Sequence, residues 1–135
     1  MRVGSGYDIH RLETGDGVVL GGIKIPLGKR LKGHSDGDAL THAIIDALLG
    51  AAALGDIGQH FPDTDPAYRG ISSLKLLKKT ADLLEAGGYS IINIDSIVVA
   101  EEPRVAPHKE KIRASLAGTL GITVSQISVK GKTAE

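Results

Sequence analysis

Hydrophobic positions recur at helical spacing in two long segments of the chain. From Asp38 to Leu54 the apolar residues follow this spacing without a proline, and the run ends at Gly55. They extend almost all the way round the helix, which predicts a buried one. Residues 71–86 carry apolar side chains on one side and lysines on the other, and glycines 87 and 88 follow. This pattern predicts an amphipathic helix with one solvent-facing side.

Shorter β-branched runs predict strands between these helices. Val18 to Leu27 contains two such runs on either side of Gly21-Gly22, which is typical of a hairpin because its turn needs positive φ angles. Ile91 to Ala100 and Val124 to Lys130 predict two further strands, and Pro107 to Leu120 predicts the helix between them.

Strands and helices therefore interleave along the chain, without repeats or linkers. We expect one α+β domain over residues 1–135, with helices packed on one face of a mixed β-sheet. The length of 135 residues and the hydrophobic content of 41% fit a single core. Only 3% of the residues are aromatic, so small aliphatic side chains must fill that core. Oligomerisation is a reasonable supplement to its stability.

Charge and composition exclude several classes of function. Lysine plus arginine and aspartate plus glutamate number 16 each, so no net positive field favours nucleic acid or an acidic membrane surface. No run reaches the length of a membrane span, and the first residues lack a signal segment, so we expect a cytoplasmic protein. Cysteine is absent, so any metal ion must be bound by histidine and carboxylate ligands.

Three residues form a candidate metal site. Asp8 and His10 are two positions apart in an extended segment, and therefore project to the same side. His42 lies with Asp38 and Asp46 on a polar stripe of the buried helix. If His42 joins Asp8 and His10, two imidazoles and one carboxylate suit Zn²⁺ with a fourth position open to water or substrate.

Other interpretations remain open at this level. A buried histidine that is hydrogen-bonded in a core is the alternative to a ligand, and spacing alone does not show that these segments meet. Asp46, one turn after His42, could orient that imidazole. The residues Gly4-Ser5-Gly6 lack the third glycine of a dinucleotide fingerprint, and residues 131–133 lack the first glycine of a P-loop. On physical grounds alone, residues 56–65 predict a solvated connector.

Taken together, several segments in the same order resemble the 2-C-methyl-D-erythritol 2,4-cyclodiphosphate synthases, enzymes of the non-mevalonate route to isoprenoids. The resemblance covers essentially the whole chain. It rests on Gly4-x-Gly6-x-Asp8-x-His10, on residues 34–38 followed by His42, on residues 49–58, and on Phe61-Pro62-Asp63-Thr64-Asp65.

The resemblance implies roles for individual residues. Asp8, His10 and His42 match zinc ligands, and Glu135 matches a carboxylate associated with a second divalent cation, Mg²⁺ or Mn²⁺. His34 and Thr133 match catalytic positions that stabilise the transition state. The positions that match substrate-binding residues are Asp8, His10, His34, Ser35, Asp56, Ile57, Gly58, Phe61, Pro62, Asp63, Thr64, Asp65, Ala100, Pro103, Arg104, Val105, Ala106, Gly131, Lys132, Thr133 and Glu135.

The same resemblance implies a ferredoxin-like subunit in a homotrimer with active sites between neighbouring subunits. The reaction it implies converts 4-diphosphocytidyl-2-C-methyl-D-erythritol 2-phosphate into the 2,4-cyclodiphosphate and CMP. Arg104-Val105-Ala106 departs from relatives that have a lysine and bulkier apolar residues there. The family continues after Thr133-x-Glu135 with a glycine-rich turn, a strand and a helix, so we expect that C-terminal tail to be missing here. A zinc phosphodiesterase and a non-catalytic trimeric binder of cytidine nucleotides or isoprenoid phosphates are the alternative functions.

Overall fold

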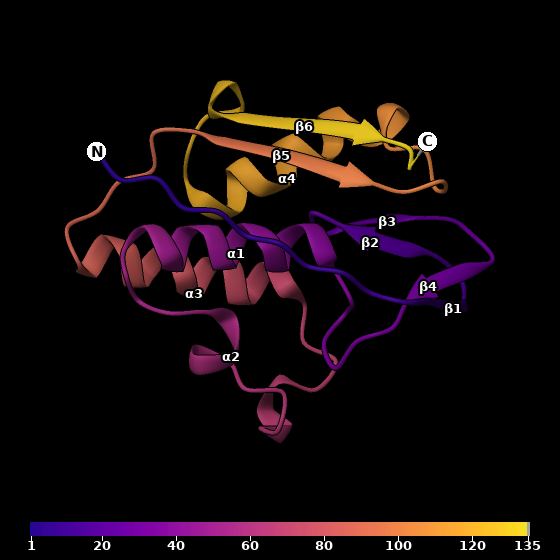
Figure 1. Cartoon of the computed structure of the whole chain (residues 1–135), viewed down its shortest axis with the longest axis horizontal. Coiled ribbons are helices and arrows are strands. Elements are labelled where there is room, and N and C mark those ends of the chain that lie inside the picture. The colour runs from indigo at the N-terminus through magenta and orange to yellow at the C-terminus, as the bar shows by residue number, and fades with distance from the viewer. Residues whose placement is uncertain (135) are drawn as a thin grey trace.

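The computed structural model describes residues 1–134, so the predicted metal ligand Glu135 lies outside the described residues. Strands and helices interleave along the chain, which confirms the α+β class (Figure 1). The elements are β1 (Leu12–Thr14), β2 (Val18–Leu20), β3 (Ile23–Ile25), β4 (Lys29–Leu31), α1 (Ala39–Ala51), α2 (Ile57–His60), η1 (Pro66–Tyr68), α3 (Ser73–Ala86), β5 (Ile94–Val99), η2 (Ala106–His108), α4 (Lys109–Leu120), η3 (Val124–Gln126) and β6 (Ile127–Lys132).

Helices α1, α3 and α4 enclose the hydrophobic core. Ile45, Leu49, Leu77, Ile112 and Leu116 are completely buried where these helices meet. In α1 only Gly50 is exposed, as the nearly all-round apolar pattern predicts. Helix α3 has the predicted solvent-facing side but begins at its third predicted residue. None of the helices in residues 1–134 combines the length and apolar character that crossing a membrane requires.

The predicted single mixed sheet is wrong for the described part of the chain. Within residues 1–134 the strands form three two-stranded sheets, of which β1–β4 and β2–β3 are antiparallel and β5–β6 is parallel. Strand β6 starts at Ile127 because residues 124–126 form a 3₁₀ turn instead. Helix α4 connects the two parallel strands and packs behind their sheet, while α1 and α3 lie below it (Figure 1).

The predicted hairpin is confirmed, and a buried carboxylate fixes it to α1. Gly21 and Gly22 have φ angles of 58° and 77° in the turn between β2 and β3. Asp38, the N-cap of α1, is fully buried and accepts hydrogen bonds from both glycine N–H groups at 3.0 and 2.7 Å. It also accepts from the Thr41 N–H and hydroxyl at 3.0 and 2.7 Å. Burial raises the pKa of Asp38, although these donors oppose the shift.

The N-terminal segment, residues 1–11, crosses in front of α1 (Figure 1). A Cβ atom on Gly4 would lie 1.8 Å from the carbonyl oxygen of Ala47, and one on Gly6 would lie 1.8 Å from that of Ala43. Two extended residues advance about 6.6 Å and four helical residues about 6 Å, so the two backbones remain in step. Every second residue of the segment therefore faces α1.

We expect replacement of Asp38 by alanine to lower the free energy of unfolding by about 3 kcal/mol, because buried N–H groups lose their acceptor and α1 loses its cap. Urea denaturation measures this change. The control is Asp16→Ala, just before the same hairpin, whose exposed carboxylate pairs with Lys24 and whose loss should leave the unfolding midpoint unchanged. Equal midpoints for the two variants would show that Asp38 does not anchor the hairpin.

Candidate functional site

Asp8, His10 and His42 come together where the N-terminal segment meets the first turn of α1. After Gly4 and Gly6, Asp8 is the next residue that faces the helix. The side chain of His42 points back towards the start of α1, as helical side chains do, and so meets Asp8 there. The Oδ2 atom of Asp8 lies 2.7 Å from His10 Nε2 and 3.1 Å from His42 Nδ1. The structure thus confirms that these segments meet.

The three side chains are partly shielded from solvent. Asp8, His10 and His42 are 26%, 14% and 13% exposed, respectively. Burial alone would raise the pKa of Asp8, but hydrogen bonds and charge attraction from both imidazoles outweigh it and hold that pKa well below its usual value. The hydrogen bond to Asp8, opposed by burial, raises the pKa of His10.

This donor set fits a divalent metal ion. One oxygen or nitrogen ligand atom from each of Asp8, His10 and His42 lies within 4.8 Å of the others. The second nitrogen of each imidazole is already engaged away from this point. His10 Nδ1 donates to the Lys32 carbonyl, and His42 Nε2 lies 2.7 Å from the Ser73 hydroxyl. Metal-bound histidines in proteins show the same division between the two ring nitrogens.

The predicted role of Asp46 in orienting His42 is wrong. The Oδ1 atom of Asp46 accepts from the Ile57 N–H at 2.8 Å, so this carboxylate holds the start of α2 instead. His42 Nε2 faces the hydroxyl groups of Ser35 and Ser73 at 3.1 and 2.7 Å. Sequence reasoning missed Ser73, because its partner lies 31 residues away and helical periodicity gives no signal for it.

A second group of predicted residues is connected to the triad through Ser35. Ser35 bonds to His42, and the backbone carbonyl of His34 accepts from Gly70 N at 2.9 Å. The predicted connector, residues 56–65, is more ordered than expected. Asp56 accepts from Gln59 N and caps α2 in a capping box. Phe61 is buried, with its ring edge-on to Tyr68 at 5.7 Å. Pro62, Asp63, Thr64 and Asp65 form the turn that leads into η1.

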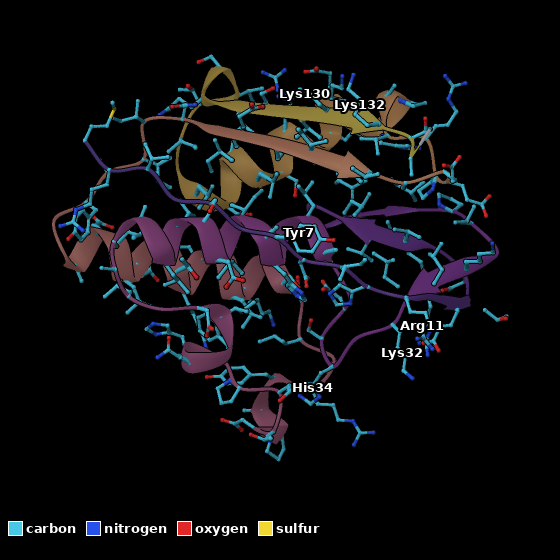
Figure 2. The ribbon with its side chains drawn as sticks, in the orientation of Figure 1. Tyr7, Arg11, Lys32, His34, Lys130 and Lys132 are labelled. Carbon is cyan, nitrogen blue, oxygen red and sulfur yellow. The ribbon has the colours of Figure 1, made fainter. Side chains whose placement is uncertain are left out.

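A third group gathers at the ends of β5 and β6. The Ala100 N–H donates to the Lys132 carbonyl at 2.9 Å, and Gly131 packs closely against the buried side chain of Val105. The structure therefore places residues 100–106 beside residues 131–133. In Figure 2 Lys132 lies on the β5–β6 sheet, whereas His34 lies on the other side of α1. One chain does not bring these two groups together.

Comparison with known proteins gives consistent matches along the whole chain. Residues 1–135 match the YgbB family. A 2-C-methyl-D-erythritol 2,4-cyclodiphosphate synthase from Syntrophomonas wolfei is 58% identical over 135 residues, which cover all of this chain and 86% of the relative. The enzyme of the same name from Chloroherpeton thalassium is 57% identical over the same shares of the two chains.

Solved structures agree with these matches. A 2C-methyl-D-erythritol-2,4-cyclodiphosphate synthase in a CDP-bound form superimposes with a TM-score of 0.92 and 40% identity, over 98% of this chain and 89% of that one. The bifunctional IspDF of Campylobacter jejuni gives a TM-score of 0.95 at 40% identity, over 99% of this chain but 36% of that longer one. The CDP complex of Plasmodium falciparum IspF gives 0.85 at 38% identity, over 99% and 82%.

We expect Gly6→Ala to weaken the binding of a divalent metal ion by Asp8, His10 and His42 about tenfold or more, which corresponds to about 1.4 kcal/mol. The new methyl group would collide with the Ala43 carbonyl and move Asp8 and His10 away from His42. Competition with a chromophoric chelator measures the affinity. The control is Gly50→Ala in α1, the helix that Gly6 contacts, because the new methyl group at position 50 would meet no atom within 4 Å. Wild-type affinity in Gly6→Ala would contradict the proposed dependence on close packing.

Proposed function

The chain belongs to the YgbB family and has the 2-C-methyl-D-erythritol 2,4-cyclodiphosphate synthase activity of its relatives, and we propose that it performs this reaction at a zinc site formed by Asp8, His10 and His42. The convergence of one carboxylate and two imidazoles, with their remaining nitrogens engaged elsewhere, is the observation that carries the proposal. Zinc prefers such ligands and, with three of them from protein, keeps a position open.

The proposed reaction is an intramolecular phosphoryl transfer. An oxygen of the 2-phosphate of 4-diphosphocytidyl-2-C-methyl-D-erythritol 2-phosphate forms a bond to the β-phosphorus of the same molecule. The bond from that phosphorus to the bridging oxygen breaks, and CMP leaves with the oxygen and its electron pair. The nucleophile is already an anion, so a strong general base is not needed. The site must instead orient both ends of the substrate and neutralise crowded negative charge.

The bound zinc ion would supply Lewis-acid polarisation of a phosphate oxygen. The chain's own residues would do the positioning. We assign the methylerythritol end of the substrate to the loop of residues 56–65 together with Ser35. His34 and Thr133 would donate hydrogen bonds to phosphoryl oxygens in the transition state. A second divalent cation, Mg²⁺ or Mn²⁺, would neutralise the diphosphate beside Glu135.

The cytidine end is assigned to residues 100–106 and 131–133. These segments are already in contact in the structure, and Arg104 and Lys132 offer exposed cations there. CDP-bound structures of relatives support a cytidine nucleotide as ligand. Because this group lies across α1 from His34 (Figure 2), we propose that a complete site combines two subunits.

A homotrimer is the assembly we propose. The N-terminal segment turns Val3, Tyr7 and Ile9 outwards, and they are 88%, 79% and 75% exposed. Strand β5 adds Ile97 and Val99, which are 57% and 62% exposed. Large apolar side chains gathered on a surface favour association with another subunit. A cyclic trimer would provide three equivalent interfaces, with one site at each.

Phosphorus NMR of the substrate mixed with zinc-loaded protein and Mg²⁺ tests the reaction. We expect CMP and a cyclic diphosphate, and loss of both products in His42→Ala because the metal site loses a ligand. An open-chain phosphate product would indicate a zinc phosphodiesterase. Unchanged substrate that remains tightly bound to the wild-type protein would indicate a binding protein.

Mixed trimers test whether sites are shared. His42→Ala and Thr133→Ala should each lose most activity when alone, the latter about 100-fold or more if its hydroxyl stabilises the transition state. Coexpressed in equal amounts, they should recover about a quarter of the wild-type sites, because random cyclic trimers pair intact halves at that frequency. If one chain forms the whole site, mixing would restore nothing.

A further inference from the structure

A chain of hydrogen bonds leads from the triad into the start of α3. The Nε2 atom of His42 lies 2.7 Å from the Ser73 hydroxyl oxygen. Ser73 is the first residue of α3 and is completely buried. Its hydroxyl in turn makes a short hydrogen bond to Oδ1 of Asp36, and its N–H donates to Oδ2 of the same carboxylate at 2.9 Å. Asp36 thereby takes the place of a side-chain cap on α3, where Ser72 makes no such bond.

The direction of each hydrogen bond from Asp36 through Ser73 to His42 determines whether Nε2 of His42 is protonated. The Asp36 carboxylate offers only acceptors, so the single hydroxyl proton of Ser73 is donated to it. The Ser73 oxygen can then only accept from His42, and Nε2 of His42 must carry a proton. With Nε2 protonated, Nδ1, the atom that faces Asp8 at 3.1 Å, is the nitrogen that can give its lone pair to a metal ion.

From this arrangement we propose that Asp36 and Ser73 are positioning residues, which hold His42 in the tautomer and ring orientation that present Nδ1 to the metal ion. The proposal rests on the zinc site of the proposed function. It assigns a role to two residues that do not touch the substrate in that scheme. Ser35 makes a longer contact of 3.1 Å to the same nitrogen, whereas the shorter contact comes from the buried Ser73 hydroxyl, which is tied to Asp36.

The hydrogen bonds from His42 through Ser73 to Asp36, called the relay below, also connect the triad to the rest of the fold. Asp36 lies in the loop that precedes α1, and its Oδ1 accepts from the Asp38 N–H at 3.1 Å. Asp38 is the residue that caps α1 and holds the β2–β3 turn. The position of His42 on α1 and that of Ser73 on α3 are therefore set by neighbouring carboxylates in one short loop. Small shifts of α3 should be transmitted to the imidazole.

Histidine nitrogen NMR on the wild-type chain tests the tautomer directly. In zinc-free protein, Nε2 of His42 should carry a proton, and after addition of Zn²⁺ the metal should bind through Nδ1 with Nε2 still protonated. A neutral ring with its proton on Nδ1 in the zinc-free protein, or zinc bound through Nε2, would overturn the proposal. This measurement requires no variant to fold.

Removal of the relay tests its effect on metal affinity. Ser73→Ala should weaken Zn²⁺ binding about 10- to 100-fold, measured with the metal alone by chelator competition, and should give a mixture of His42 tautomers. The matched control is Thr80→Val, which removes another completely buried hydroxyl from α3, one that donates to the Leu76 carbonyl of its own helix. We expect wild-type zinc affinity and a single His42 tautomer in this control.

The outcomes separate this proposal from the proposed function. If the wild-type chain binds zinc and Ser73→Ala binds it equally well with an unchanged tautomer, the relay is refuted while the metal site stands. If Ser73→Ala and Thr80→Val lose affinity equally, the effect is a general disturbance of α3, and the relay is again refuted. If the wild-type chain binds no zinc, both proposals fail.

Asp36→Asn should shift the affinity for Zn²⁺ in the same direction as Ser73→Ala, because the amide can also donate a hydrogen bond and no longer dictates the direction of the serine's proton.

Discussion

The backbone of the N-terminal segment approaches α1 so closely that only glycine fits at the two contact positions. A side chain at Gly4 or Gly6 would overlap the carbonyl oxygen of Ala47 or Ala43. Because the advance of two extended residues nearly equals that of four helical residues, this contact also determines where the next residue falls. Asp8 arrives at the first turn of α1, where His42 points back to meet it. Backbone packing alone therefore places the residues of the candidate metal site next to one another.

Three aspartate carboxylates near this contact each accept hydrogen bonds from a different part of the fold. Asp38 joins the β2–β3 turn to α1, and Asp46 holds the start of α2. Asp36 joins the loop that precedes α1 to the start of α3. Burial of such groups would be costly without these donors. The polar stripe on the otherwise apolar surface of α1 consists of the N-cap Asp38, the candidate ligand His42 and Asp46, so it serves both the fold and the site.

Local patterns were enough to predict α1, α3, α4 and the hairpin, because each has a clear period and a glycine or proline at its boundary. The pairing of Asp8 with His10 was likewise predictable from the two-residue period of an extended segment. Features that depend on tertiary position could not be predicted from local patterns. Asp46 was assigned to His42 from i,i+4 spacing, yet the structure directs it to Ile57, and the bond from His42 to Ser73 spans 31 residues. The single mixed sheet was wrong for a similar reason, because strand propensity does not specify a partner.

The central claim is that Asp8, His10 and His42 hold one metal ion and that the fold prepares them to do so. A crystal of the zinc-loaded full chain, with diffraction recorded on both sides of the zinc absorption edge, would locate the ion without reference to activity. The account predicts an anomalous peak bonded to a carboxylate oxygen of Asp8, to Nε2 of His10 and to Nδ1 of His42. A peak elsewhere, with Asp8 still hydrogen-bonded to both imidazoles, would contradict it.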